Sequence, residues 1–201
     1  MTYTPIDEWI LFNHRRPPQG AGFTVEDLYK LPDLPRHTEL IDGCLMRADP
    51  QTDFHSVVLC MLYGVLRRSA TDGMWVIQQM TVVLDRYNAP EPDLSVVHAK
   101  AVRDRTQDRF EAEDVVLAVE AVARDTRERD ERVKARKYAA AGIPYFWLVE
   151  PTGRRWRPQV RTHELDAQKG CYVPTGTYRG RLHAARPFTI DVDLDVLLDR
   201  L

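Results

Sequence analysis

Val115-Val116-Leu117-Ala118-Val119-Glu120-Ala121-Val122 is the most apolar run of the chain and, being rich in β-branched residues, predicts a buried strand. A second buried strand is predicted at Tyr145-Phe146-Trp147-Leu148-Val149. Between them, Asp125 or Thr126 can cap a helix that ends near Ala141, with Gly142 just beyond its end. Strand, helix and strand in this order predict a parallel crossover, which places the chain in the α/β class.

The remainder of the chain predicts one domain with an arm in front of it. A length of 201 residues suits a single domain with a sizeable core. Residues 1–22 mix large apolar residues with prolines and glycines and are expected to form a helical or docked arm, and 23–201 the domain. Further elements are expected as a capped helix at 24–31, a hairpin at 38–46 turning at Asp42-Gly43, an amphipathic helix at 53–70, strands at 75–79, 81–84 and 92–97, short strands over 154–190, and a closing helix at 194–201.

Composition narrows the cellular setting and the partners. The net charge of −2 gives no global attraction to nucleic acid, so an anionic partner must be held by a local patch. Cys44, Cys60 and Cys171 are widely spaced, which argues against a disulfide framework or a zinc ribbon and favours a reduced, cytoplasmic setting. No apolar run is long enough to span a bilayer, and the N-terminus lacks a signal-peptide pattern, so no membrane association is expected.

Two acids lie inside apolar strand-like runs. Asp93 falls in Glu91-Pro92-Asp93-Leu94-Ser95-Val96-Val97, and Glu120 in the run quoted first. Burying a carboxylate is costly unless a partner or a metal compensates it. On neighbouring strands the two acids would form a site for a hard cation such as Mg²⁺. Taken singly, each could instead be a strand-end group that caps a turn or pairs with an arginine.

The helix that follows Glu120 is basic along one stripe. Arg127, Asp130, Lys134, Lys137 with Tyr138, and Ala141 follow one another at helical spacing. Either Lys134 or Lys137 could face a phosphate or a metal-bound water beside the acids. The alternative is a solvated face held by pairs such as Asp130–Lys134.

Three further features leave alternatives open. Glu39, before the Asp42-Gly43 turn, and His55, at the start of a long helix, could reach the same site from its other side or be surface groups. In residues 154–186 basic side chains outnumber acidic ones, with Trp156, Tyr172 and Tyr178 interleaved. That composition suits a nucleic-acid-binding surface, and equally an ordinary polar face of a sheet.

The order of these motifs resembles a known family. ELIDG at 39–43, EPDLSVV at 91–97, LAVEAVA at 117–123 and RERDERVKARKYAAAGIPYFWLVEP at 127–151 closely resemble the Uma-two family of restriction-endonuclease-related proteins, within the PD-(D/E)xK nuclease superfamily. The resemblance covers nearly the whole of 23–200. It implies a restriction-endonuclease-like core, a mixed β-sheet flanked by helices.

The resemblance also implies roles for particular residues. It implies that Asp93 and Glu120 are metal-binding acids and that Glu39 is a third candidate ligand of the metal. The active lysine of the superfamily normally lies two residues after the second acid, where this chain has Val122, and the family resemblance moves that role to Lys134. Arg127, Lys137 and Tyr138 are the expected substrate-binding residues. The family's usual serine after the second acid is replaced by Ala123, which removes a hydroxyl near the site.

The leading hypothesis is therefore an endonuclease that uses Mg²⁺ or Mn²⁺ to hydrolyse phosphodiester bonds, with DNA favoured over RNA. The alternative is a nucleic-acid-binding or interaction module that keeps the fold and has lost its chemistry, as the change at Ala123 suggests. A purely structural protein is the third option. A homodimer would match the two-fold symmetry of a duplex.

Overall fold

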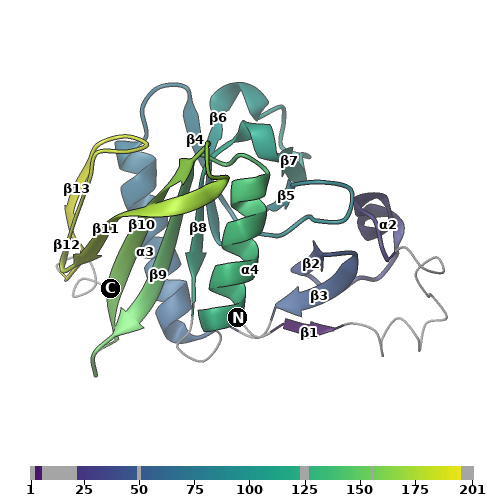
Figure 1. Ribbon diagram of the computed structural model, residues 1–201, viewed down its shortest axis with the longest axis horizontal. Coiled ribbons are helices and arrows are strands. Elements are labelled where there is room, and N and C mark those ends of the chain that lie inside the picture. The colour runs from purple at the N-terminus through teal and green to yellow at the C-terminus, as the bar shows by residue number, and fades with distance from the viewer. Residues whose placement is uncertain (1–2, 6–21, 49–50, 123–126, 155, 196–201) are drawn as a thin grey trace.

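A six-stranded mixed sheet forms the centre of the molecule (Figure 1). The computed structural model describes residues 3–5, 22–48, 51–122, 127–154 and 156–195. The strand order of the sheet is β11-β10-β9-β8-β6-β4. Its strands are β4 (Met74–Gln78), β6 (Leu94–His98), β8 (Val115–Ala121), β9 (Tyr145–Thr152), β10 (Arg157–Asp166) and β11 (Cys171–Arg179).

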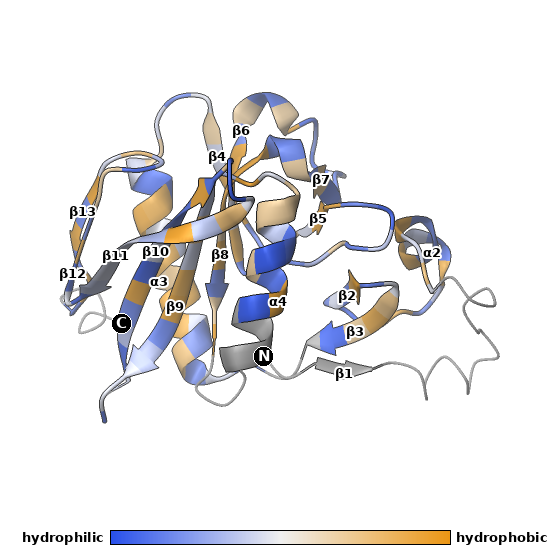
Figure 2. Ribbon diagram, in the orientation of Figure 1, coloured by the Kyte–Doolittle hydropathy of each residue, from blue (hydrophilic) through white to orange (hydrophobic). Residues whose placement is uncertain are grey.

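Two helices, α3 (Asp53–Ser69) and α4 (Arg127–Ala140), cover opposite faces of this sheet (Figure 1). Helix α3 buries Val58, Leu62 and Leu66 in a cluster shared with the central strands. Helix α4 contributes the fully buried Tyr138 to a second cluster, which contains Phe146 from β9. Burying each large apolar side chain contributes about 1.5–3 kcal/mol, so both helices are held mainly by packing. In Figure 2 the central strands are largely apolar, whereas much of α4 is hydrophilic.

The predicted crossover is confirmed, because β8 and β9 are parallel neighbours and α4 connects them. Side chains alternate along β8. Leu117, Val119 and Ala121 belong to the cluster under α3, whereas Ala118 belongs to the cluster under α4. Glu120 therefore points toward the α4 face, and this alternation decides which helix can reach its carboxylate.

A smaller sheet packs beside the main one. It has the order β1-β3-β2, with β1 (Tyr3–Pro5), β2 (Thr38–Ile41) and β3 (Cys44–Ala48). The predicted hairpin turn is confirmed: φ is 50° at Asp42 and 73° at Gly43, as a type I′ turn requires. A bridge between Leu40 and Ala89 ties this sheet to the segment that leads into β6. That bridge brings Glu39 close to the acids of the main sheet.

The remaining elements are short. Helix α2 (Val25–Lys30) has the predicted cap, in which Thr24 and Asp27 form a capping box. Strands β5 (Thr81–Val83) and β7 (Arg109–Glu111) pair in parallel, and β12 (Arg181–Ala184) pairs with β13 (Ile190–Asp193). Single 3₁₀ turns, η1 (Ala99–Ala101) and η2 (Ala112–Asp114), flank β7.

The mixed sheet flanked by helices is thus confirmed, with one correction at the N-terminus. The arm was expected to be helical or docked, and its described part, Tyr3–Pro5, is not helical but is a strand docked on β3; residues 6–21 of the arm lie outside the described part of the chain. The same is true of 196–201, most of the expected closing helix. Among the residues that the structure describes, none of the helices is long and apolar enough to cross a bilayer.

Candidate active site

Glu120 lies on β8, and Asp93 directly precedes the neighbouring strand β6. Strands β6 and β8 are antiparallel with Leu94 opposite Val119, and this register brings Asp93, just before β6, opposite Glu120. Asp93 is 1% exposed and Glu120 5% exposed. Two buried carboxylates this close need compensation, and the surrounding side chains supply it.

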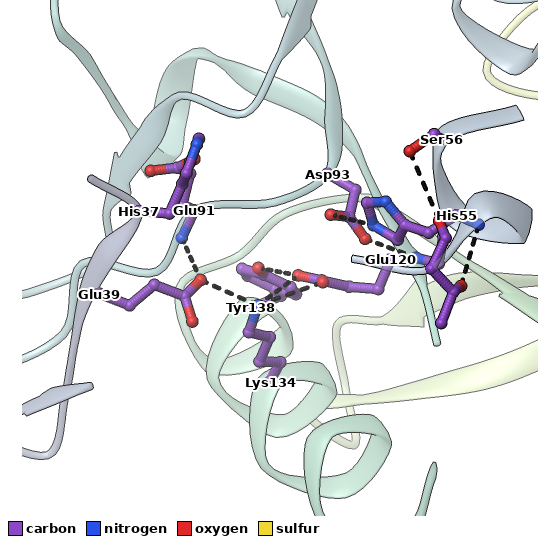
Figure 3. Close-up of polar contacts among 11 residues, drawn as sticks. His37, Glu39, His55, Ser56, Glu91, Asp93, Glu120, Lys134 and Tyr138 are labelled. Carbon is purple, nitrogen blue, oxygen red and sulfur yellow. Dashed lines mark hydrogen bonds and ion pairs between the residues drawn. The ribbon is translucent and has the colours of Figure 1, made fainter. Parts of the chain in front are cut away.

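Asp93 is held by two hydrogen bonds (Figure 3). Its Oδ2 accepts the backbone N–H of Ala121 at 2.7 Å, and its Oδ1 lies 2.8 Å from Nε2 of His55. His55 is buried in the first turn of α3, which Thr52 caps. Of the two roles left open for His55 by the sequence, the structure thus supports the one inside the site. Its position in the first turn of a helix that covers the sheet is the signal that pointed there.

Glu120 is bound by two side chains from one face of α4 (Figure 3). Lys134 Nζ lies 3.2 Å from its Oε2 and 3.1 Å from its Oε1, and the Tyr138 hydroxyl donates to Oε1 at 2.6 Å. The spacing of four residues puts Lys134 and Tyr138 one above the other on the helix, so both reach the same carboxylate.

The protonation of Glu120 reflects this crowding. Burial, together with the nearby charges of Asp93 and Glu39, raises the pKa of Glu120 from its ordinary value of 4.5 to about 8. The ammonium of Lys134 and the hydroxyl of Tyr138 oppose that rise. Burial, together with the negative charge of Glu120, also raises the pKa of Tyr138 well above its usual value, so Tyr138 remains a donor.

Glu39 completes the cluster from the small sheet. It is 1% exposed, and its Oε1 accepts hydrogen bonds from Lys134 Nζ at 2.9 Å and from the backbone N–H of Glu91. Its other oxygen, Oε2, is buried without a hydrogen-bond partner. An orphaned carboxylate oxygen is costly in a folded protein, and at the edge of a polar cluster it is a free ligand position.

The expected substrate-binding residues have different places. Tyr138 is fully buried and contacts Glu120, so its side chain supports the acid instead of forming an exposed surface. Lys137 points away from the acids and pairs with Asp42, which lies in the turn between β2 and β3. The backbone of Arg127 opens α4, and its side chain lies outside the described part of the structure, as does Ala123.

The donor set of the cluster fits a divalent cation of the Mg²⁺ type. Asp93, Glu120 and Glu39 offer only oxygen atoms, which such cations prefer. Within the described ranges, no three His, Cys, Asp or Glu side chains already form a ready ligand cage, because Lys134 lies between Glu39 and Glu120. Mg²⁺ needs no such cage, since it is commonly bound through one or two carboxylates and keeps several waters.

Comparisons with known proteins agree with this architecture. A family model described as "Uma2: Putative restriction endonuclease" matches residues 25–196. A crystal structure of a putative nuclease belonging to DUF820, from Anabaena variabilis ATCC 29413, is similar with a TM-score of 0.67. The sequence identity is 14%, and the match covers 88% of this chain and 98% of that one.

At this identity the likeness concerns the fold, which is the restriction-endonuclease-like α/β fold predicted from the motifs. The comparison with curated proteins gave no match. The family match spans most of the chain, including Glu39, Asp93, Glu120 and Lys134. The chain therefore belongs to the Uma2 family of putative restriction endonucleases.

Proposed function

We propose that this protein is an endonuclease that hydrolyses phosphodiester bonds of nucleic acid with the help of Mg²⁺ or Mn²⁺, and that DNA is its substrate. One observation carries the proposal: the buried residues Asp93 and Glu120 occupy opposite positions of adjacent chain segments, and the ammonium of Lys134 is next to Glu120. Two acids and one lysine suit phosphodiester hydrolysis, which a bound cation and positive charge near the reacting phosphate accelerate.

The metal would be held by Asp93 and Glu120, with the orphaned Oε2 of Glu39 as a third oxygen donor. When bound, such a cation lowers the pKa of a coordinated water and polarises the phosphoryl oxygen. The protein would contribute preorganisation: His55 and the Ala121 N–H fix the carboxylate of Asp93, and Tyr138 fixes that of Glu120.

Lys134 is assigned two roles. In the free protein its ammonium offsets the charges of Glu39 and Glu120. With substrate present, the same ammonium would orient the attacking water and stabilise the negative charge that develops on the phosphate. Lys137, and Arg127 at the first position of α4, would contact phosphates of the bound strand.

The test is cation binding by calorimetry and plasmid cleavage on the same samples. Asp93→Asn keeps the shape of the side chain and an acceptor for the Ala121 N–H, so it should fold. It should lose Mg²⁺ binding and reduce cleavage by orders of magnitude. Asp108→Ala removes an exposed acid outside the cluster and should behave like the wild type. Full metal-dependent cleavage by the Asp93→Asn variant would rule the assignment out.

The second candidate is an interaction module on the same fold. It is favoured by the position of Lys134, which already compensates Glu39 and Glu120 without a metal. Nucleic-acid binding that ignores added metal, with no cleavage of any substrate, would select it. We also propose a cytoplasmic homodimer, for which light scattering on the protein with and without duplex DNA is the direct test.

A further inference from the structure

Two large apolar side chains stand out as exposed among the residues that the structure describes. Trp156 is 48% exposed and Trp75 is 38% exposed. The ring of Trp75, on β4, is covered by the guanidinium of Arg67 at 3.8 Å. Trp156, in the turn between β9 and β10, has an aromatic neighbour, because its ring centroid lies 6.2 Å from that of Phe54.

Through Phe54, Trp156 contacts the helix turn that also carries His55 of the candidate active site. Phe54 lies in the first turn of α3 and directly precedes His55, whose Nε2 is 2.8 Å from Asp93. Strand β9 runs parallel to β8 and continues past it, so the turn that follows β9 lies beyond the end of β8 that carries Glu120. In Figure 1 this turn and the start of α3 are at the same end of the sheet as the start of α4.

The backbone conformation of Trp156 is disfavoured for a bulky residue. Its φ of 53° lies in the left-handed region, which bulky residues rarely adopt. The indole is also left half in water, although burying it would be favourable. Disfavoured backbone conformations cluster at ligand-binding sites, and an exposed aromatic ring beside a second one is a surface on which a flat group can stack.

The turn is basic as well as aromatic. Its sequence is Gly153-Arg154-Arg155-Trp156-Arg157, without an acid. Arg154 is exposed, and Arg157 is partly buried near Asp195. A cation-binding role is excluded by these charges, whereas a polyanion would be attracted. Aromatic rings that stack on bases, next to arginines that hold the backbone, are the usual means of binding single-stranded nucleic acid.

We infer that Trp156 stacks on an unpaired base of the strand that enters the active site, while Arg154 holds the adjoining phosphate. The inference rests on the proposed nuclease function and narrows its substrate. In an intact duplex both faces of a base are covered by its neighbours, so a ring can stack only where the strand is single or locally unpaired. Single-stranded DNA, or a duplex with an unpaired stretch, is then bound better than a fully paired duplex.

The experiment measures fluorescence anisotropy of a labelled oligothymidylate and of a paired duplex of equal length, with Ca²⁺ replacing Mg²⁺ to limit cleavage. The variants are Trp156→Ala, Trp156→Phe and, as the matched control, Trp75→Ala. The Trp156→Ala variant should bind the single strand about tenfold more weakly, a loss within the range that is typical of removing an aromatic ring on which a base stacks. Trp156→Phe should retain most of the affinity, and Trp75→Ala all of it.

Each result has a definite meaning, because cleavage with Mg²⁺ is followed in parallel. Equal binding by Trp156→Ala and Trp75→Ala, with cleavage intact, overturns the stacking inference and leaves the nuclease proposal standing. An equal loss on duplex and single strand also overturns it, since the contact would then be to the backbone. A change in the molecular mass of Trp156→Ala by light scattering would assign this surface to a second copy of the chain. Absence of binding and of cleavage in the wild type overturns both proposals.

Discussion

Replacing Lys134 by methionine tests the charge balance of the acid cluster most directly. The substitution keeps much of the buried stem and removes the ammonium that pairs with Glu39 at 2.9 Å and Glu120 at 3.1 Å. Removing one partner of a buried ion pair costs about 3–5 kcal/mol, because the remaining charge has no compensation. For a chain of this size the melting temperature should fall by roughly 6–20 °C at pH 8, at about 2–4 °C per kcal/mol.

The loss of stability caused by Lys134→Met should increase with pH. The pKa of Glu120 is about 8 in the folded protein and 4.5 in its ordinary state, so the folded protein holds an extra proton between these values. A group whose pKa is raised by folding loses its stabilising contribution as the pH rises through the folded value. Lys134 lowers the pKa of Glu120, so its removal raises that pKa further and increases the loss of stability with rising pH. Lys134→Met should therefore be more destabilised, relative to the wild type, at pH 8 than at pH 6.

Denaturant unfolding at both pH values, with Lys137→Met as the matched control, is the appropriate assay. Lys137 is on the same helix and pairs with the exposed Asp42, so its loss should cost about 0–1 kcal/mol at either pH. A Lys134→Met variant as stable as Lys137→Met, or equally destabilised at pH 6 and pH 8, would refute the reasoning about the cluster.

Three further predictions concern the same site. Tyr138→Phe removes the hydroxyl that donates to Glu120, so the unsatisfied acceptor should lower the free energy of unfolding by about 1–3 kcal/mol and slow single-turnover cleavage. An unchanged melting curve and cleavage rate would contradict the role given to Tyr138. His55→Ala removes the partner of Asp93 Oδ1 and should weaken Mg²⁺ affinity about 10–100-fold in calorimetry, and His55→Gln should restore part of that affinity. Equal affinity in the wild type and His55→Ala would show that His55 does not position Asp93. Because Glu120 must lose a proton to bind a cation, Mg²⁺ affinity should fall about tenfold for each pH unit below about 8. An affinity that is the same at pH 6 and pH 8 would show that Glu120 is already ionised.

The stability of the acid cluster has a wider consequence for the mechanism. Lys134 compensates Glu39 and Glu120 in the free protein, whereas Asp93 is held by His55 and the Ala121 N–H. A cation bound at Asp93 and Glu120 would compete with Lys134 for Glu120. Under the proposed function, that competition would free the ammonium to face the substrate, and metal binding would then be coupled to the placement of Lys134.

The sequence by itself determined the elements and the two central acids. The β-branched run that contains Glu120, the capped helix after Thr24 and the Asp42-Gly43 turn all carry local signals, because strand periodicity, capping and turn geometry depend on residues close in the chain. Asp93 and Glu120 stood out for a similar reason, since an acid within an apolar run is conspicuous in one dimension.

Tertiary structure decided which side chains meet those acids. Lys134 reaches Glu39 across 95 residues of chain, and His55 reaches Asp93 across 38. Helical spacing left the choice between Lys134 and Lys137 open, the family resemblance favoured Lys134, and Tyr138 was expected to bind substrate. The way α4 lies on the sheet turned Lys134 and Tyr138 inward to Glu120 and Lys137 outward to Asp42. Helical spacing fixes which residues share a face, but only packing against the sheet fixes where that face points.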